Sequence, residues 1–173
     1  MLRFVTRHLK KFRRDQRGAV MVEMTLVAPL MLTLSAGVFE FGNLIHDKLL
    51  MEAGLSDGAR FAARCNSQIY TDAGLAAINC ADIASNIAVY GNVAGTGNAR
   101  VPNWQKANVT VTIGTGCHDA VVGGVMQYRS TTAQVCVVQA DGTYPYTGVG
   151  MLSLIGIGPI TLSGSHQERL MRF

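Results

Sequence analysis

The sequence predicts an α+β fold in which one long N-terminal helix packs against a small antiparallel β-sheet, with a second helix between them in the chain. Three observations support this prediction. Apolar residues fill 19–39, and a stripe with i, i+3, i+4 spacing continues the helical pattern to about Arg64. A shorter helical pattern follows within 73–90. The last third contains β-branched segments in which apolar and polar residues alternate, which is typical of strands.

The N-terminal end of the chain is strongly basic. Seven of its first 17 residues are basic, against the single acid Asp15: Arg3, Arg7, Lys10, Lys11, Arg13, Arg14 and Arg17. This segment therefore carries a charge of +6, whereas the other 8 basic and 10 acidic residues sum to −2. The pI near 9.0 thus reflects a leader, and it does not indicate nucleic-acid binding. A basic segment before an apolar one is expected on the cytoplasmic side of a membrane.

The apolar segment 19–39 is predicted to span a membrane. Between Arg17 and Glu40 there are 22 residues, and Glu23 is the only charged one. A helix of this length spans about 33 Å, enough to cross a bilayer core. A carboxylate at mid-membrane costs about 2.5–3.5 kcal/mol, which makes Glu23 a candidate functional residue. We expect the N-terminus in the cytoplasm and residues 40–173 on the far side, in the periplasm or outside the cell.

A cleaved secretory signal peptide is the alternative interpretation. Its apolar region would be Met24–Leu34, and Ser35–Gly37 would form its small-residue cleavage site. The long basic leader, the charge at Glu23 and the helical pattern beyond Gly37 argue against it.

Helical features are expected from Ala19 to about Tyr90. The first helix should run to Arg64 and end over Cys65–Ser67, and Pro29 should kink or locally open it. Its last turns are rich in small residues, which allow another element to approach closely: Ala53, Gly54, Ser56, Gly58, Ala59, Ala62 and Ala63. A second helix is expected over 73–90, with Thr71 or Asp72 as N-cap. The Gly- and Asn-rich segment 91–103 is expected to be a loop.

The remaining chain is expected to form three or four antiparallel strands. The predicted segments are strands at Asn108–Ile113 and Ala133–Gln139, a turn at Asp141-Gly142, a restarted or extended strand at Thr143–Thr147, an apolar link at Leu152–Gly158, and a final strand at Ile160–Leu170 bulged at Gly164. The sheet should pack on the outer half of the long helix. Trp104 is expected at the edge of the core, with an exposed contact as the alternative.

Four cysteines follow the apolar segment, in agreement with an oxidising compartment. They allow three pairings, of which the pairs nearest in sequence, Cys65–Cys80 and Cys117–Cys136, are favoured. Each would close a loop worth about 3 kcal/mol. No zinc-ligand spacing recurs, so a metal site is not expected. Cys117, His118 and Asp119 suggest a nucleophile, but strand neighbours point to opposite faces, and a loop beside a disulfide is favoured.

The junction of leader and apolar segment carries the most specific motif. Gly18 follows the basic leader, Ala19 begins the apolar helix, and Glu23 is the fifth residue after Gly18. This layout resembles the processing site of type IV prepilins, and the segment Gln16–Arg64 resembles TadE-like pseudopilins of the tight-adherence (Tad/Flp) pilus system. The resemblance implies a type IV pilin-like fold, cleavage after Gly18 by a prepilin peptidase, and a new N-terminus at Ala19. Glu23 would pair with that amine in its own chain or in a neighbour.

The resemblance also implies three parts and a structural role. Residues 1–18 would be a leader removed on maturation, 19–39 a transmembrane and filament-core helix in which Pro29 assists packing, and 40–173 a periplasmic or extracellular domain. The implied function is that of a structural pilin without a cofactor or enzymatic activity. A minor rather than a major pilin is favoured, because 155 mature residues exceed the length of the very short major pilins. Expected partners are the prepilin peptidase, other pilin-like subunits, the major pilin, the inner-membrane assembly platform and, before assembly, membrane lipid. The alternative is a signal-anchored or secreted periplasmic binding domain outside any filament.

Overall fold

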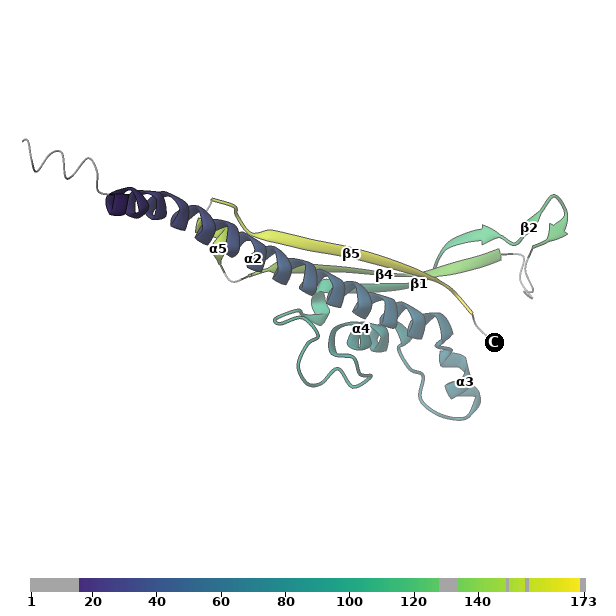
Figure 1. Ribbon diagram of the computed structural model, residues 1–173. Helices are drawn as coiled ribbons and strands as arrows, with labels where there is room; N and C mark the ends of the chain where they lie inside the picture. The colour runs from purple at the N-terminus through teal and green to yellow at the C-terminus, as the bar shows by residue number, and fades with distance from the viewer. Residues whose placement is uncertain (1–15, 128–133, 149, 155, 172–173) are drawn as a thin grey trace, which may run out of the picture.

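The computed structural model describes residues 16–127, 134–148, 150–154 and 156–171. One long helix dominates the molecule (Figure 1), and its N-terminal end projects beyond the sheet and the short helices. The helix, α2, spans Gln16–Arg64. It ends where the sequence predicts, and its assignment is continuous through Pro29. It begins before Gly18, so the residues at the predicted cleavage site are themselves helical, whereas the first fifteen residues of the predicted leader lie outside the described part.

A three-stranded antiparallel sheet packs against the C-terminal half of α2, as predicted (Figure 1). Its order is β1-β4-β5, from β1 (Val109–Asp119), β4 (Gln134–Tyr146) and β5 (Ile160–Arg169). Burial alternates along the central strand: Val138, Ala140, Tyr144 and Tyr146 are buried, while the residues between them are half-buried or exposed. Period-two alternation of this kind means that one face of the sheet carries the core and the other faces outward.

The predicted turn at Asp141-Gly142 and the predicted bulge at Gly164 are both wrong. Strand β4 runs through Gly142, which pairs with Val109 on one side and with Gly164 on the other, in continuous register. Both glycines lie under α2. A Cβ at Gly142 would stand 3.0 Å from Leu55 Cδ2, and one at Gly164 would stand 3.0 Å from the Cε of Met51. These glycines therefore mark the close approach of helix and sheet, and the chain from Thr143 extends the same strand.

The second helix is shorter than predicted. Helix α4 spans Cys80–Tyr90, and the chain before it forms a separate short helix, α3 (Ser67–Asp72), followed by an irregular segment. The N-cap is Asn79, whose side chain accepts a hydrogen bond from the Asp82 amide at 3.1 Å, so the caps expected at Thr71 and Asp72 are wrong. The reason is local: Gly74 has a φ of +76°, a left-handed conformation that ends α3 and prevents a continuous helix from 73.

Helices α2 and α4 cross at the small residues of α2. A Cβ at Gly54 would collide with the carbonyl oxygen of Ala88, and one at Gly58 would stand 2.7 Å from the carbonyl oxygen of Ala84. This confirms that small residues allow an element of the outer domain to approach α2. Each alanine or glycine buries little surface, but the two backbones can pack directly against each other.

The 91–103 segment is irregular, as predicted, and is anchored into the core at its end. Trp104 is 1% exposed, which excludes an exposed contact, and its Nε1 donates to the Thr143 carbonyl oxygen at 3.0 Å. The hydroxyl of Tyr144 donates to the Pro102 carbonyl oxygen at 3.0 Å. Loop, helix and sheet therefore share one core.

Three other short elements were not predicted. A short hairpin follows β1, and a single helical turn lies within the apolar link between β4 and β5. Their bounds, with those of a 3-10 turn before β1, are β2 (Val121–Val122), β3 (Val125–Met126), α5 (Met151–Leu154) and η1 (Lys106–Asn108). Strand β1 is also longer than predicted, because it continues past Ile113 to Asp119 through two register shifts.

Candidate processing and assembly site

The N-terminal half of α2 is an apolar helix that no other described element covers. Nearly every side chain from Gly18 to Phe39 is exposed, including Leu26 at 72% and Leu32 at 71%. By length and composition this helix can cross a membrane, and none of its most apolar window is buried within the protein. Exposed apolar surface of this extent requires a non-aqueous environment. The arrangement is that of a single-pass membrane anchor.

Gly18 and Ala19 lie at the open end of this anchor. A Cβ built on Gly18 would meet no atom of another described element within 4 Å, so no packed segment crowds this position. No other described element packs over the Gly18–Ala19 peptide bond, which itself lies within the first turn of α2.

Glu23 follows on the same helix, four residues after Ala19. Residues at i and i+4 lie above one another on a helix surface, with Cβ atoms about 5–6 Å apart. An amine at the start of a chain beginning with Ala19 would therefore lie on the same side as the Glu23 carboxylate. Glu23 is exposed, and within the described residues it has no hydrogen-bond or ion-pair partner.

Pro29 lies in the middle of the exposed helix. Because proline has no N–H, the carbonyl of Thr25, four residues earlier, lacks its usual helical donor. The Thr25 hydroxyl instead donates to the Met21 carbonyl oxygen at 2.7 Å. The helix therefore lacks one backbone hydrogen bond at Pro29, although it is continuous there.

Glu40 marks the boundary between the anchor and the packed domain. It is only 2% exposed, and the Tyr146 hydroxyl donates to its carbonyl oxygen at 3.0 Å. Gly148, with a φ of +52°, lies so close that a Cβ there would collide with the Glu40 carboxylate. Burial, together with the charge of Glu40, raises the pKa of Tyr146 to about 12. Sequence reasoning did not identify Glu40 as a buried residue, although an acid that directly ends an apolar segment was the available signal.

Both disulfides join the cysteines nearest in sequence, Cys65 to Cys80 and Cys117 to Cys136. The first ties the end of α2 to the start of α4, and the second joins β1 to β4. Cys117, His118 and Asp119 belong to strand β1, so the expected loop is wrong. The bond to Cys136 also removes the free thiol that a nucleophile would need. Across the described residues, no three metal-ligating side chains lie close enough to hold an ion.

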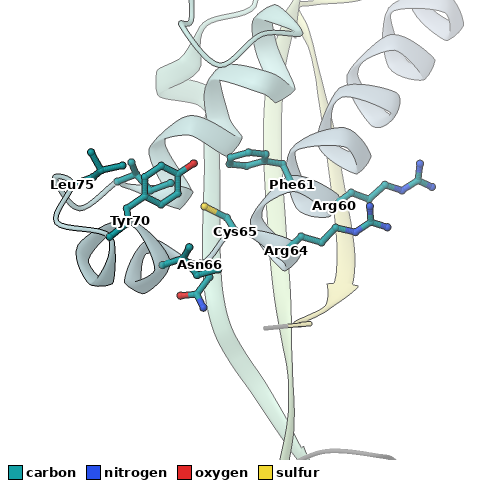
Figure 2. A pocket seen from close by; sticks show the side chains of 10 residues that line it. Arg60, Phe61, Arg64, Cys65, Asn66, Tyr70 and Leu75 are labelled. Carbon is teal, nitrogen blue, oxygen red and sulfur yellow. The ribbon is translucent and has the colours of Figure 1, made fainter. Parts of the chain in front are cut away.

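A cavity of about 600 Å³ opens beside the first disulfide, between the end of α2 and the segment around α3. Figure 2 shows Phe61 and Tyr70 on opposite sides of Cys65. Arg60 and Arg64 also line the cavity, and their side chains extend away from Tyr70 and Leu75. Sequence analysis did not predict this cavity, because it depends on the unpredicted helix α3. The sequence signal was a cluster of apolar residues, Ile69, Tyr70, Leu75 and Ile78, in a segment of otherwise polar character.

The fold and the uncovered helix define a membrane-anchored α+β protein. Residues 18–60 match the family model described as TadE-like protein, which confirms the resemblance over this segment, about a quarter of the chain. The match associates the chain with the Tad pilus. Neither the comparison with curated proteins nor that with solved structures gives a match.

Proposed function

We propose that this chain is a minor pilin, or pseudopilin, that assists the assembly or initiation of a Tad/Flp-type adhesion pilus and is matured by cleavage after Gly18. The observation that carries the proposal is the position of Gly18 and Glu23 at the open end of an apolar helix that the domain leaves uncovered. A soluble domain has no use for such a helix. A filament subunit needs it twice, first as a membrane anchor and then as a filament core.

The three parts of the chain have separate roles in this proposal. The basic residues 1–18 hold the N-terminus in the cytoplasm and are removed by a prepilin peptidase. Residues 19–39 hold the protein in the inner membrane before assembly, with the domain 40–173 in the periplasm. The assembly platform then moves the helix from lipid into contact with the major pilin and other pilin-like subunits.

The charge of Glu23 fixes how neighbouring subunits align during assembly. In an apolar core an amine and a carboxylate interact strongly because screening is weak, and leaving either one unpaired is costly. Exposed as it is, Glu23 can pair with the Ala19 amine of its own chain or with that of a neighbour. Pro29 supports this step, since a helix lacking one hydrogen bond can adapt its path to adjacent helices.

Two substitutions test the proposal. Gly18→Leu should block maturation, and Glu23→Ala should permit cleavage but reduce pilus assembly. The readouts are intact mass and N-terminal sequencing of protein from native membranes, together with counts of sheared pili. Gly37→Leu is the matched control for the first variant, because Gly37 lies on the same helix and is equally open. Glu52→Ala is the control for the second, because Glu52 is another partly exposed acid of α2.

The processing product separates the alternatives. A start at Ala19 supports the proposal, whereas a start near Val38 would mean that signal peptidase releases a secreted binding domain. A start at Met1 in cells with active peptidase would indicate a signal-anchored protein. Unchanged piliation in both variants would refute the filament role.

A further inference from the structure

The hairpin 120–127 carries apolar side chains on both of its faces. Gly123 and Gly124 have φ values of +60° and +80°, the backbone of a tight hairpin turn, and Gln127 N donates to the Ala120 carbonyl oxygen at 2.8 Å. Its paired residues are Val121 with Met126 and Val122 with Val125. Because strand neighbours point to opposite faces, one pair lies on each face.

These four side chains are 37–64% exposed. An isolated two-stranded hairpin is marginally stable in water, and one with two apolar faces has no face suited to solvent. We therefore expect another surface to cover these apolar side chains.

The hairpin lies beyond the end of the long helix (Figure 1). Met171 N donates to the Ala63 carbonyl oxygen, and Leu170 N donates to that of Cys136, which places the Cys117–Cys136 disulfide level with the end of α2. The chain continues from Cys117 outward to the hairpin. None of the residues lining the cavity next to Cys65 comes from it, so the described hairpin does not fill that cavity within one molecule.

The cavity is concave and lined largely by apolar side chains, so it complements the protruding apolar hairpin. It is bounded by the aromatic rings of Phe61 and Tyr70 and by aliphatic side chains, of which Ile69 and Leu75 are 59% and 61% exposed. Its volume of about 600 Å³ is in the range of cavities that enclose a compact group of apolar atoms. It is large enough to receive side chains from one turn of a hairpin.

Charges flanking the two features are complementary. Asp119, at the base of the hairpin, is exposed, and Gln134 Nε2 donates to its Oδ1 at 3.3 Å. Arg60 and Arg64 are among the residues that line the cavity, and their guanidinium groups point outward from it. Arg60 already pairs with Glu168 at 3.4 Å, whereas Arg64 has no ion-pair partner within the described residues. Arg64 can therefore accept an acidic partner without losing an existing contact.

We propose that the hairpin 120–127 of one copy inserts into the cavity beside Cys65 of a second copy, with Asp119 facing Arg64. Hairpin and cavity are different surfaces, so the contact is heterologous and leaves a free hairpin and a free cavity at its two ends. A tip with four apolar side chains is small beside the interfaces of stable complexes, which bury about 1,200–2,000 Å². The contact thus forms between copies already held parallel by the membrane or filament, and to that extent it rests on the proposed function.

Site-specific photo-crosslinking tests this contact in the full-length chain in its native membranes. A benzophenone amino acid at Val122 should give a dimer of this protein whose crosslinked peptide, identified by mass spectrometry, lies within 60–78. The control carries the same group at Val93, which is 60% exposed on the 91–103 segment, and should give no such dimer. Crosslinks from Val122 only to lipid, only to another protein, or to no partner would overturn the proposal.

A charge exchange tests the orientation. Asp119→Arg and Arg64→Asp should each remove most of the dimer, and the double variant should restore it. Circular dichroism and non-reducing mass spectrometry verify that each variant keeps its fold and both disulfides. Folded single variants with undiminished dimer, or a folded double variant without restoration, would overturn the proposed contact.

The two proposals fail in distinguishable ways, because processing and piliation are measured in the same cells. Absence of the dimer with a normal Ala19 start and normal pili overturns the hairpin contact alone. A dimer that persists in a chain that is never cleaved and never enters a pilus overturns the pseudopilin role and supports the contact.

Discussion

The effect of replacing a glycine of α2 depends on whether another element packs against it. A Cβ at Gly54 would collide with the Ala88 carbonyl oxygen, whereas one at Gly42 meets nothing within 4 Å. We expect Gly54→Ala to destabilise the domain by about 1–3 kcal/mol, because the α2–α4 crossing must open. Gly42→Ala should stabilise it by about 0.5–1 kcal/mol through helix propensity. Thermal unfolding of the purified protein in detergent measures both. Equal effects at the two positions would contradict the close crossing.

Tyr146 makes the stability of the domain sensitive to high pH. Its pKa is raised to about 12 from an ordinary value of 10. The unfolded chain therefore loses this proton first as pH rises, so the stabilisation is complete below pH 10 and is lost between pH 10 and about 12. The loss should amount to about 2–3 kcal/mol. Burial raises the pKa of Tyr144 as well, in the same direction.

Urea unfolding between pH 9 and 12 measures this effect. Tyr146→Phe should lower stability by about 1 kcal/mol at neutral pH, because the hydrogen bond to the Glu40 carbonyl is lost. The same variant should have a shallower alkaline loss than the parent. Tyr70→Phe, at an exposed tyrosine, is the matched control. An unchanged alkaline slope in Tyr146→Phe would show that other groups cause the loss.

At the scale of elements, the Cys65–Cys80 disulfide holds the segment that contains α3. This segment contributes no buried residue from α3 itself, and its ends are fixed at α2 and α4. Replacing both cysteines with serine should cost about 3 kcal/mol, as expected for closing a loop of 15 residues. It should also make 66–79 the first site of limited proteolysis. The Cys117/Cys136 double serine variant is the control, since it should leave proteolysis of 66–79 unchanged.

The elements that the sequence predicted are those with repeated local signals. The long apolar stripe defined α2 to its last residue, and β-branched alternation located all three strands of the sheet. The failures occurred where a distant contact determined the structure. Asp141-Gly142 is a strong local turn signal, yet Gly142 lies in mid-strand because it pairs with Val109 and Gly164. A glycine occurs there because Leu55 of α2 leaves no room for a side chain. No local pattern contains that information.

Two other elements were not predicted although the sequence contains a local signal for each. The turn signal Gly123-Gly124 between paired apolar residues indicates a hairpin, and Gly74 followed by Asn79 indicates a helix end and a new cap. The proposed processing motif needs no tertiary information, because Gly18 and Glu23 lie on one helix. Glu40 and the cavity beside Cys65 depend on elements that meet only in the folded chain.

At the scale of the whole molecule, the chain divides at Phe39 and Glu40 into an uncovered helix and a domain with its own core. The buried cluster begins at Met51 on α2, and Glu40 is the first buried side chain of the helix. The apolar character of α2 does not stop at this boundary. Val38, Phe41, Ile45 and Leu49 remain 44–71% exposed on the outer surface of the helix. The domain therefore has an exposed apolar stripe along α2 beyond the anchor segment.

A chain beginning at Val38 tests this division. It retains Glu40 and the whole core, so we expect it to fold with both disulfides and to unfold cooperatively. It should also self-associate, because the stripe remains exposed. Changing Phe41, Ile45 and Leu49 to glutamine, a good helix former, should give a monomer by sedimentation and shift the thermal midpoint by only a few degrees.

The two measurements separate folding from association. Glutamine at Thr110, Thr112 and Thr143, on the open polar face of the sheet, is the control and should leave self-association unchanged. An unfolded Val38 chain would show that the domain depends on the membrane helix, and a monomeric parent fragment would show that the stripe makes no contact of its own. A folded, self-associating parent with a monomeric triple variant would place a subunit contact along α2 outside the membrane. That contact would be independent of Glu23.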